Sequence, residues 1–170
     1  MGTGYGVIEP GPGGVAVLDS GVIATAADLP LEARVHRIYD GVAVLLDVHA
    51  PGVLVLEDLY AEYRFPRTAL LMAHARGVVC LAARQRDVLV LALSPAEVKR
   101  AIAAHGAASK VQIQHGVQRL LGLAALPRPS HVADALALAL TGLSRLSGGP
   151  RNGPPPPRRS AAPRPSRGAP

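Results

Sequence analysis

The chain has 170 residues, enough for one domain with a real core, and 49% of them are hydrophobic, which is typical of folded proteins. Of the net charge of +6, five charges belong to arginines after Leu146, so the charge does not mark the rest of the chain as a nucleic-acid binder. The lone Cys80 excludes an intrachain disulfide, and no apolar run reaches the ~18 residues of a membrane span. We expect a cytoplasmic protein in which Cys80 is a buried small hydrophobe.

The composition changes near Leu146. Residues 147–170 contain Ser, Gly, Pro, Arg, Asn and Ala but no acid and almost nothing to bury. We therefore predict a folded domain over residues 1–146 and a disordered tail over residues 147–170. The five tail arginines predict a sequence-independent attraction to DNA. The alternative is that the tail is only a solubilising extension.

The first elements in chain order are two strands and a helix. Residues 5–9 and 15–24 are Val-rich and joined by Pro-Gly-Pro-Gly-Gly, which predicts an antiparallel hairpin. From Pro30 the apolar spacing changes to that of a helix, which ends before Pro51. The continuous apolar run over residues 53–56 then predicts a strand buried on both faces.

The later elements are a helix over residues 66–85, a buried strand over residues 88–93 and three helices. Ser94-Pro95-Ala96-Glu97 opens the first of these helices with the pattern of a capping box. The other two are predicted over residues 109–121 and 130–143, the last with Ser130 as its N-cap. This alternation predicts a layered α/β domain.

Glu57 follows the apolar strand directly, at the end of the strand where α/β sheets place their ligand sites. A carboxylate at that edge is a candidate metal ligand. The alternative is a strand-end acid that is simply solvated, like its neighbours Asp58 and Glu62.

His131 and Asp134 are three residues apart at the start of the last predicted helix, so their side chains lie on one face. This spacing suits binding of one shared metal ion. The alternative is that Asp134 complements the helix dipole and that His131 merely lies beside the N-cap.

Lysine is rare in this chain, where only Lys99 and Lys110 contribute to the 18 basic Lys and Arg residues. Two ammonium groups near one site would suit contacts to phosphate or to a developing negative charge. The alternative is chance survival of two lysines in an arginine-rich composition.

Tyr60 lies in an aromatic segment with Tyr63 and Phe65, which together make three of the chain's five aromatic residues. Such a segment could stack on an unpaired DNA base. A small apolar cluster that packs the loop is the alternative.

These motifs, in this order, resemble the RuvC family of crossover junction endodeoxyribonucleases over residues 2–145. The resemblance is carried by six segments: Thr3-Gly4-Tyr5-Gly6-Val7-Ile8, Val55-Leu56-Glu57, Ala75-Arg76-Gly77-Val78, Val98-Lys99, Ala108-Ser109-Lys110 and Pro127-Arg128-Pro129-Ser130-His131-Val132-Ala133-Asp134-Ala135-Leu136. At the position of His131 many members of the family carry Asp and some carry His.

The resemblance implies an RNase H-like fold, a mixed five-stranded sheet flanked by helices, with Ala75-Arg76-Gly77-Val78 in a helix at a dimer interface. It implies a homodimer that nicks two strands of a four-way junction in recombination and repair, supplied by a branch-migration motor complex. Glu57, His131 and Asp134 would hold two Mg²⁺ ions about 3.5 to 4 Å apart. Lys99 and Lys110 would assist the catalysis and, with Tyr60, contact the DNA, and His131 would be either a ligand or a group that acts on the water.

The family's first strand, which carries a further metal-binding Asp, has no counterpart in the printed sequence. We expect a start upstream of Met1 that would restore it, and the genomic frame before Met1 is the check. Two alternatives stay open: a junction-binding protein that lacks a complete metal site, and another RNase H-like nuclease that acts on other branched or RNA-containing substrates.

Overall fold

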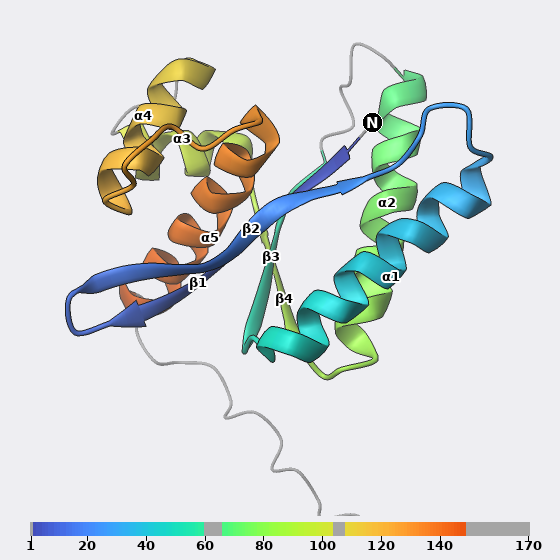
Figure 1. Ribbon diagram of the computed structural model, residues 1–170, viewed down its shortest axis with the longest axis horizontal. Coiled ribbons are helices and arrows are strands. Elements are labelled where there is room, and N and C mark those ends of the chain that lie inside the picture. Colours follow the sequence, from blue (N-terminus) through green and yellow to red (C-terminus); the bar gives the residue numbers. More distant parts are fainter. Residues whose placement is uncertain (1, 60–65, 104–107, 149–170) are drawn as a thin grey trace, which may run out of the picture.

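The computed structural model describes residues 2–59, 66–103 and 108–148. Strands and helices alternate as the sequence predicts, and an α/β architecture is confirmed (Figure 1). The elements are β1 (Gly2–Gly11), β2 (Gly14–Ala24), α1 (Leu31–His49), β3 (Val53–Glu57), α2 (Pro66–Arg84), β4 (Leu89–Leu93), α3 (Pro95–Ala103), α4 (Lys110–Leu120) and α5 (Ser130–Gly148).

The N-terminal hairpin pairs β1 with β2 in antiparallel register from Gly2 opposite Ala24 to Gly11 opposite Gly14. Gly14 adopts φ 124°, a conformation that favours glycine and that lets the chain reverse there. The pairing shifts by one residue between Val7 and Ile8, as in a β-bulge. The hairpin is the long ribbon that crosses the middle of the molecule in Figure 1.

The second strand pair is parallel, with Val53 opposite Leu89 and Glu57 opposite Leu93, and α2 makes the crossover between β3 and β4. Within the described residues β3 pairs with β4 and β1 pairs with β2, so the strands form two separate two-stranded sheets. A five-stranded mixed sheet is therefore not observed in this chain. A groove of about 530 Å³ lies between β1 and β3.

The prediction that residues 53–56 form a strand buried on both faces was wrong, because these side chains are only half-buried. The physical reason is the groove, which leaves the edge of β3 that faces away from β4 uncovered.

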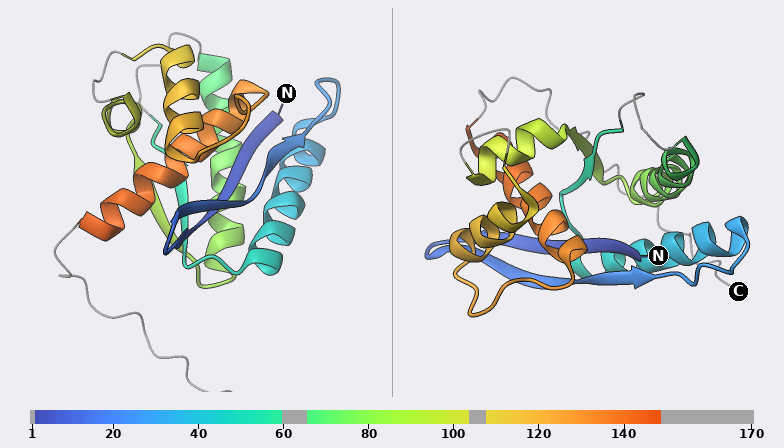
Figure 2. Two further views of the ribbon diagram at one scale, coloured as in Figure 1. Left: turned by 60° about the vertical axis from the view of Figure 1, so that its left-hand side comes forward. Right: turned by 90° about the horizontal axis from the view of Figure 1, so that it is seen from above.

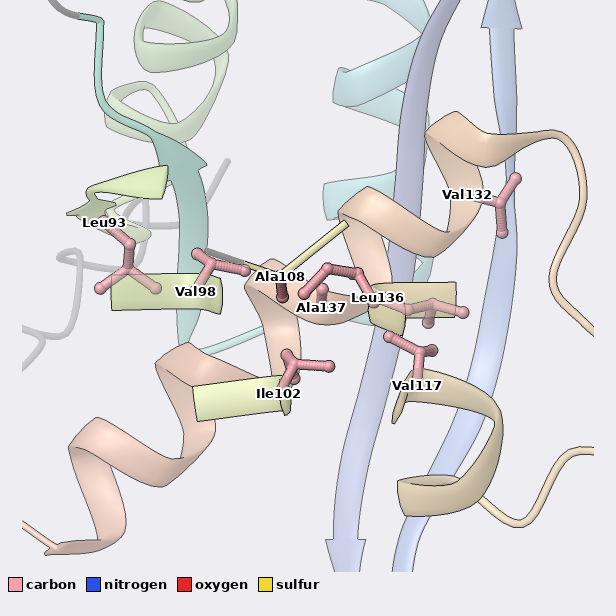
Figure 3. Packing of buried hydrophobic residues seen from close by; sticks show 9 residues of the cluster. Leu93, Val98, Ile102, Ala108, Val117, Val132, Leu136 and Ala137 are labelled. Carbon is pink, nitrogen blue, oxygen red and sulfur yellow. The ribbon is translucent and has the colours of Figure 1, made fainter. Parts of the chain in front are cut away.

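The hydrophobic core consists of two clusters, one on each side of the strands (Figures 1 and 2). Figure 3 shows the cluster formed by β4, α3, α4 and α5, in which Leu93, Val117 and Leu136 are fully buried. The second cluster joins α1 to α2 through Ile38, Leu46 and Val79. No helix in the described part of the chain is long and apolar enough to cross a membrane.

Two expectations about single residues need correction. Cys80 is half-buried on α2, because this side of the helix packs only partly against α1. The last helix continues to Gly148, past its predicted end at residue 143. Its last turns stay helical because polar residues face the solvent there, and Arg145 bonds Glu97 on α3.

Candidate active site

Four of the residues singled out in the sequence lie in one pocket of about 500 Å³. They come from four elements, since Glu57 ends β3, Lys99 lies in α3, Lys110 begins α4 and Asp134 lies in the second turn of α5. The pocket is also lined by Pro95, Val98, Ala108, Ser109, Ile113, Ala137 and Leu138. The four charged residues, up to 77 positions apart in sequence, thus bring carboxylates and ammonium groups together in one small volume.

The backbone at Glu57 is fixed from two sides. The N–H of Asp58 donates to the carbonyl oxygen of Leu93 at 2.8 Å, which extends the pairing of β3 with β4 by one residue. From α2, the Arg76 guanidinium donates to the carbonyl oxygen of Glu57 and lies 3.7 Å from the Asp58 carboxylate. Sequence reasoning gave Arg76 no role of its own, although it lies in the segment Ala75-Arg76-Gly77-Val78 that marked the helix.

Lys99 is positioned by α3, whose first turn has the Ser94 half of the predicted capping box. Ser94 Oγ accepts a hydrogen bond from the Glu97 N–H at 3.2 Å, as predicted. The Glu97 carboxylate does not close the box; its Oε1 accepts from Arg145 Nη1 of α5 at 3.1 Å. Val98 and Ile102 are buried beneath the helix. An ion pair and apolar contacts therefore bind α3 to α5 and keep Lys99 at the pocket.

Lys110 is positioned by a capping box that sequence reasoning missed. Ser109 Oγ accepts from the Gln112 N–H at 3.3 Å, and Gln112 Oε1 accepts from the Ser109 N–H at 2.8 Å. The signal was present in the sequence, since Ser followed by Gln three residues later is the pattern of such a box. The positive end of the α4 dipole adds to the Lys110 charge at the pocket wall.

Asp134 is positioned by close packing of α5 on β1. A Cβ atom placed on Gly4 would lie 2.1 Å from the carbonyl oxygen of His131, and one placed on Gly6 would lie 2.6 Å from Leu136 Cδ2. Only glycine therefore allows β1 to approach the start of α5 this closely. The close contacts at Gly4 and Gly6 therefore fix the position of the first two turns of α5, which carry Asp134, relative to β1.

The four charged side chains act on one another electrostatically. Burial in the pocket raises the pKa of Glu57 above its ordinary value, and the Asp134 carboxylate raises it further, while Lys99 and Lys110 act in the opposite direction. The two carboxylates therefore repel each other in this pocket. A cation held between them would remove this repulsion.

The structure does not bring the other two predicted site residues into the pocket. His131 is exposed on α5, one turn before Asp134, and does not line the pocket. In residues 2–59, 66–103 and 108–148, no group of three or more His, Cys, Asp or Glu side chains could hold a metal ion. Tyr60 lies outside the described residues.

Comparison with known proteins places this fold and pocket in context. The chain matches the family described as "Crossover junction endodeoxyribonuclease RuvC" over residues 1–142. A protein of that name from Fusobacterium nucleatum is 37% identical over 143 residues, which cover 84% of this chain and 75% of the relative. Another from Rhodopirellula baltica is 41% identical over 140 residues, which cover 82% and 79% of the two chains.

A solved structure gives the same assignment in three dimensions. T. thermophilus RuvC in complex with a Holliday junction substrate superimposes with a TM-score of 0.78 at 37% sequence identity. The superposition covers 85% of this chain and 88% of the T. thermophilus chain. The match to the family spans all four elements that form the pocket. This chain therefore belongs to the RuvC family of crossover junction endodeoxyribonucleases.

Proposed function

We propose that this protein resolves four-way DNA junctions by metal-dependent cutting of two strands, with the pocket around Glu57 and Asp134 as its active site. The observation that carries the proposal is the meeting of two carboxylates and two lysines from four elements in one pocket. Family membership supports the choice of substrate, because the T. thermophilus relative is bound to a Holliday junction.

Glu57 and Asp134 fit a Mg²⁺ site, because Mg²⁺ is usually held by one or two carboxylates together with water and substrate phosphates. Their mutual repulsion gives a bound cation a favourable position. We propose two ions per site, with His131 reaching the metal or its water once DNA is bound. When bound, the metal supplies an activated water and charge stabilisation at the leaving oxygen.

Lys99 and Lys110 bind and orient the DNA backbone in this scheme. Both ammonium groups line the pocket that holds the carboxylates, so a phosphate seated there would contact positive and metal-binding groups together. Hydrogen bonds and charge from fixed lysines stabilise negative charge that develops on the phosphate oxygens. The wall residues Val98 and Ile113 restrict the water around the reacting phosphate.

The chemistry is tested by Asp134→Asn, with Asp40→Asn on α1 as the matched control. Asp40 is exposed and lies 3.2 Å from His36, one turn away on α1 and outside the pocket. Incubation of a labelled four-way junction with Mg²⁺ should show paired nicks for the wild type and for Asp40→Asn, and a loss of roughly 100-fold or more for Asp134→Asn. Unchanged cleavage by Asp134→Asn would contradict this active site.

Two alternatives are separated in the same assay. Junction binding by the wild-type chain without any nicks would identify a junction-binding protein that lacks a complete metal site. Preferred cutting of a flap or of an RNA–DNA hybrid over the four-way junction would identify another RNase H-like nuclease.

We further propose that the protein acts as a homodimer through α2. Leu70, His74, Gly77 and Leu81 are spaced along one face of this helix and are exposed, Leu70 by 62% and Leu81 by 50%. Gly77 has open space around it, which leaves room for close approach of a partner helix. A twofold dimer also explains symmetric cutting, since it presents two identical sites to one junction.

The dimer is tested by Leu81→Arg, with Leu120→Arg on α4 as the control. The two leucines are equally exposed, at 50% and 49%, but lie on different helices. Sedimentation velocity should show that Leu81→Arg shifts the protein to monomer while Leu120→Arg leaves the dimer intact. Equal behaviour of the two variants would rule out α2 as the interface.

The arginines after Gly148 lie outside the described residues, and their attraction to DNA is also a proposal. Removal of residues 149–170 should weaken junction binding at low ionic strength. An unchanged binding curve would leave the tail as a solubilising extension.

A further inference from the structure

Charge is divided unevenly along the chain before the arginine-rich tail. Residues 98–133 contain five Lys and Arg residues and no Asp or Glu, whereas the other residues up to Leu146 contain eight basic and twelve acidic residues. This acid-free segment includes most of α3, all of α4, the connection to α5 and the first residues of α5. Its two lysines line the pocket, and its three arginines lie outside it. Positive charge is thus concentrated on the elements around the pocket and beyond it.

Arg119 and Arg128 in this segment are exposed and have no carboxylate partner within the residues that the structure describes. Arginines elsewhere in the fold do pair with carboxylates: Arg76, Arg84, Arg86 and Arg145. A guanidinium group that no acid neutralises is available to an anion outside the chain. These two side chains therefore mark a surface for a negatively charged partner.

Helix α4 leads from the pocket to the first of these arginines. Lys110, its first residue, lines the pocket, and Arg119 follows nine residues later. At ~1.5 Å per residue, the two positions are about 14 Å apart along the helix axis. The capping box at Ser109 and the burial of Val117 fix both ends of the helix. The two cations are therefore held at a constant separation.

The connection between α4 and α5 holds Arg128 near the start of the helix that carries Asp134 (Figure 1). The connection is anchored where it leaves α4, because the N–H of Leu123 donates to the carbonyl oxygen of Gln118 at 2.9 Å. Arg128 itself stands between two prolines, which restrict the backbone on either side of it. Little conformational entropy is therefore lost when its side chain binds a ligand.

We propose that Arg119 and Arg128 bind phosphates of the duplex arm next to the cut, so that the DNA site extends from the pocket over α4 and the start of α5. This inference rests on the proposed function, which places the cut strand in the pocket. The ~14 Å between Lys110 and Arg119 corresponds to about four phosphates of one strand, at ~3.4 Å each along the duplex axis. Arginine suits this contact because its planar guanidinium can donate two hydrogen bonds to one phosphate.

The binding test measures fluorescence anisotropy of a labelled four-way junction with the full chain in EDTA, where the DNA is not cut. Arg119→Gln and Arg128→Gln should each weaken binding roughly three- to tenfold at about 50 mM salt. Each should also reduce the slope of log K against log salt concentration by about 0.9 per bound protomer. Arg37→Gln on α1 is the matched control, because it removes the same charge from an exposed site outside the acid-free segment. Its affinity should stay within about twofold of wild type, with the same slope.

Phosphate ethylation interference locates the contact and does not depend on the absolute affinity of the variants. Ethylation of phosphates about four positions from the cut should interfere with binding of the wild type and of Arg37→Gln. The same ethylation should not interfere with binding of Arg119→Gln, while phosphates at the cut should still matter for all three proteins. A misfolded variant would instead lose the whole pattern.

Three results would overturn the proposal. If the wild type nicks the junction in Mg²⁺ but both arginine variants bind it like Arg37→Gln, this inference fails and the proposed function stands. If the wild type neither binds nor nicks the junction, both fail. If polyglutamate displaces the junction as well as linear duplex does at equal charge, the surface is one for acidic polypeptides.

Discussion

The two sides of this molecule differ in the size of the side chains that they bury completely. The pocket half, made of α3, α4 and α5 with β4, buries large side chains completely, with Leu93, Val117 and Leu136 at 0 to 1% exposure. The outer half, made of α1 and α2, buries small ones completely, Ala82 and Ala83. Large apolar residues are exposed in both halves, among them Val48 at 69% and Leu70 at 62% in the outer half and Leu89 at 60% and Val111 at 58% in the pocket half.

The closely packed half surrounds the candidate active site, and the other half carries the exposed face of α2. The pocket half holds three of the four charged residues of the candidate active site; buried side chains and an ion pair join its helices, and a capping box fixes the start of α4. The outer half contributes one guanidinium, that of Arg76, to the backbone of Glu57, and its helix α2 leaves Leu70 and Leu81 exposed. Exposed apolar surface on a helix of this kind is typical of an interface with another chain.

The largest expected effect is loss of stability on Leu136→Ala. Leu136 is 1% exposed in the pocket-half cluster, so truncation leaves a cavity and should cost about 2 to 5 kcal/mol. Leu70→Ala on the exposed face of α2 should change the unfolding free energy by less than about 0.5 kcal/mol in a monomeric sample. Urea denaturation measures both, and equal losses would mean that the two halves are packed alike.

A somewhat smaller loss of stability is expected for Gly4→Ala. The added Cβ would lie 2.1 Å from the backbone oxygen of His131, so β1 and α5 must separate, at a cost of about 1 to 3 kcal/mol. Gly77→Ala in the middle of α2 meets nothing within 4 Å and should stabilise the monomer by about 0.5 to 1 kcal/mol through helix propensity. Thermal unfolding of the two variants should therefore move in opposite directions, and a shift of the same sign would contradict the close packing at Gly4.

A gain in stability is expected for Ala50→Gly at the C-terminal end of α1. Ala50 adopts φ 42° and ψ 51°, the left-handed conformation in which a Cβ is unfavourable and in which helix ends prefer glycine. Relief of this strain should raise the unfolding free energy by about 1 kcal/mol. Ala139→Gly within α5 is the control and should be destabilising, since the helix interior disfavours glycine.

The smallest expected effect is the dependence of stability on pH that Glu57 causes. Because its pKa is raised in the folded protein, the fold favours the protonated carboxyl. Stability from this group is complete below the ordinary glutamate pKa and is lost as the pH rises through the raised value. In metal-free buffer, Glu57→Gln should therefore raise the unfolding midpoint at neutral pH and have little effect at acid pH. A pH-independent difference would contradict the raised pKa, and saturating Mg²⁺ should stabilise only the wild type.

The local patterns of the sequence predicted the elements and most of the pocket. Alternating and helical spacing located every element, and strand-end and rare-lysine arguments selected Glu57, Lys99 and Lys110. Apart from the local capping box of Ser109 and Gln112, what they missed depends on distant partners. The partner of Glu97 is an arginine 48 positions away, and Arg76 acts on a backbone carbonyl 19 positions earlier. The exposure of β3 depends on which strands neighbour it, and no pattern within residues 53–56 records that.

The hairpin of β1 and β2 contacts helices of both halves. At one end Gly4 and Gly6 bring β1 against the start of α5, and Ile23 of β2 lies where a Cβ on Gly41 of α1 would be only 2.9 Å away. These close approaches fix the hairpin against both α1 and the helix that carries Asp134. Because Thr3 pairs with Ile23, these contacts with α5 and α1 lie at the same end of the hairpin, and a substitution there would disturb the packing of both helices together.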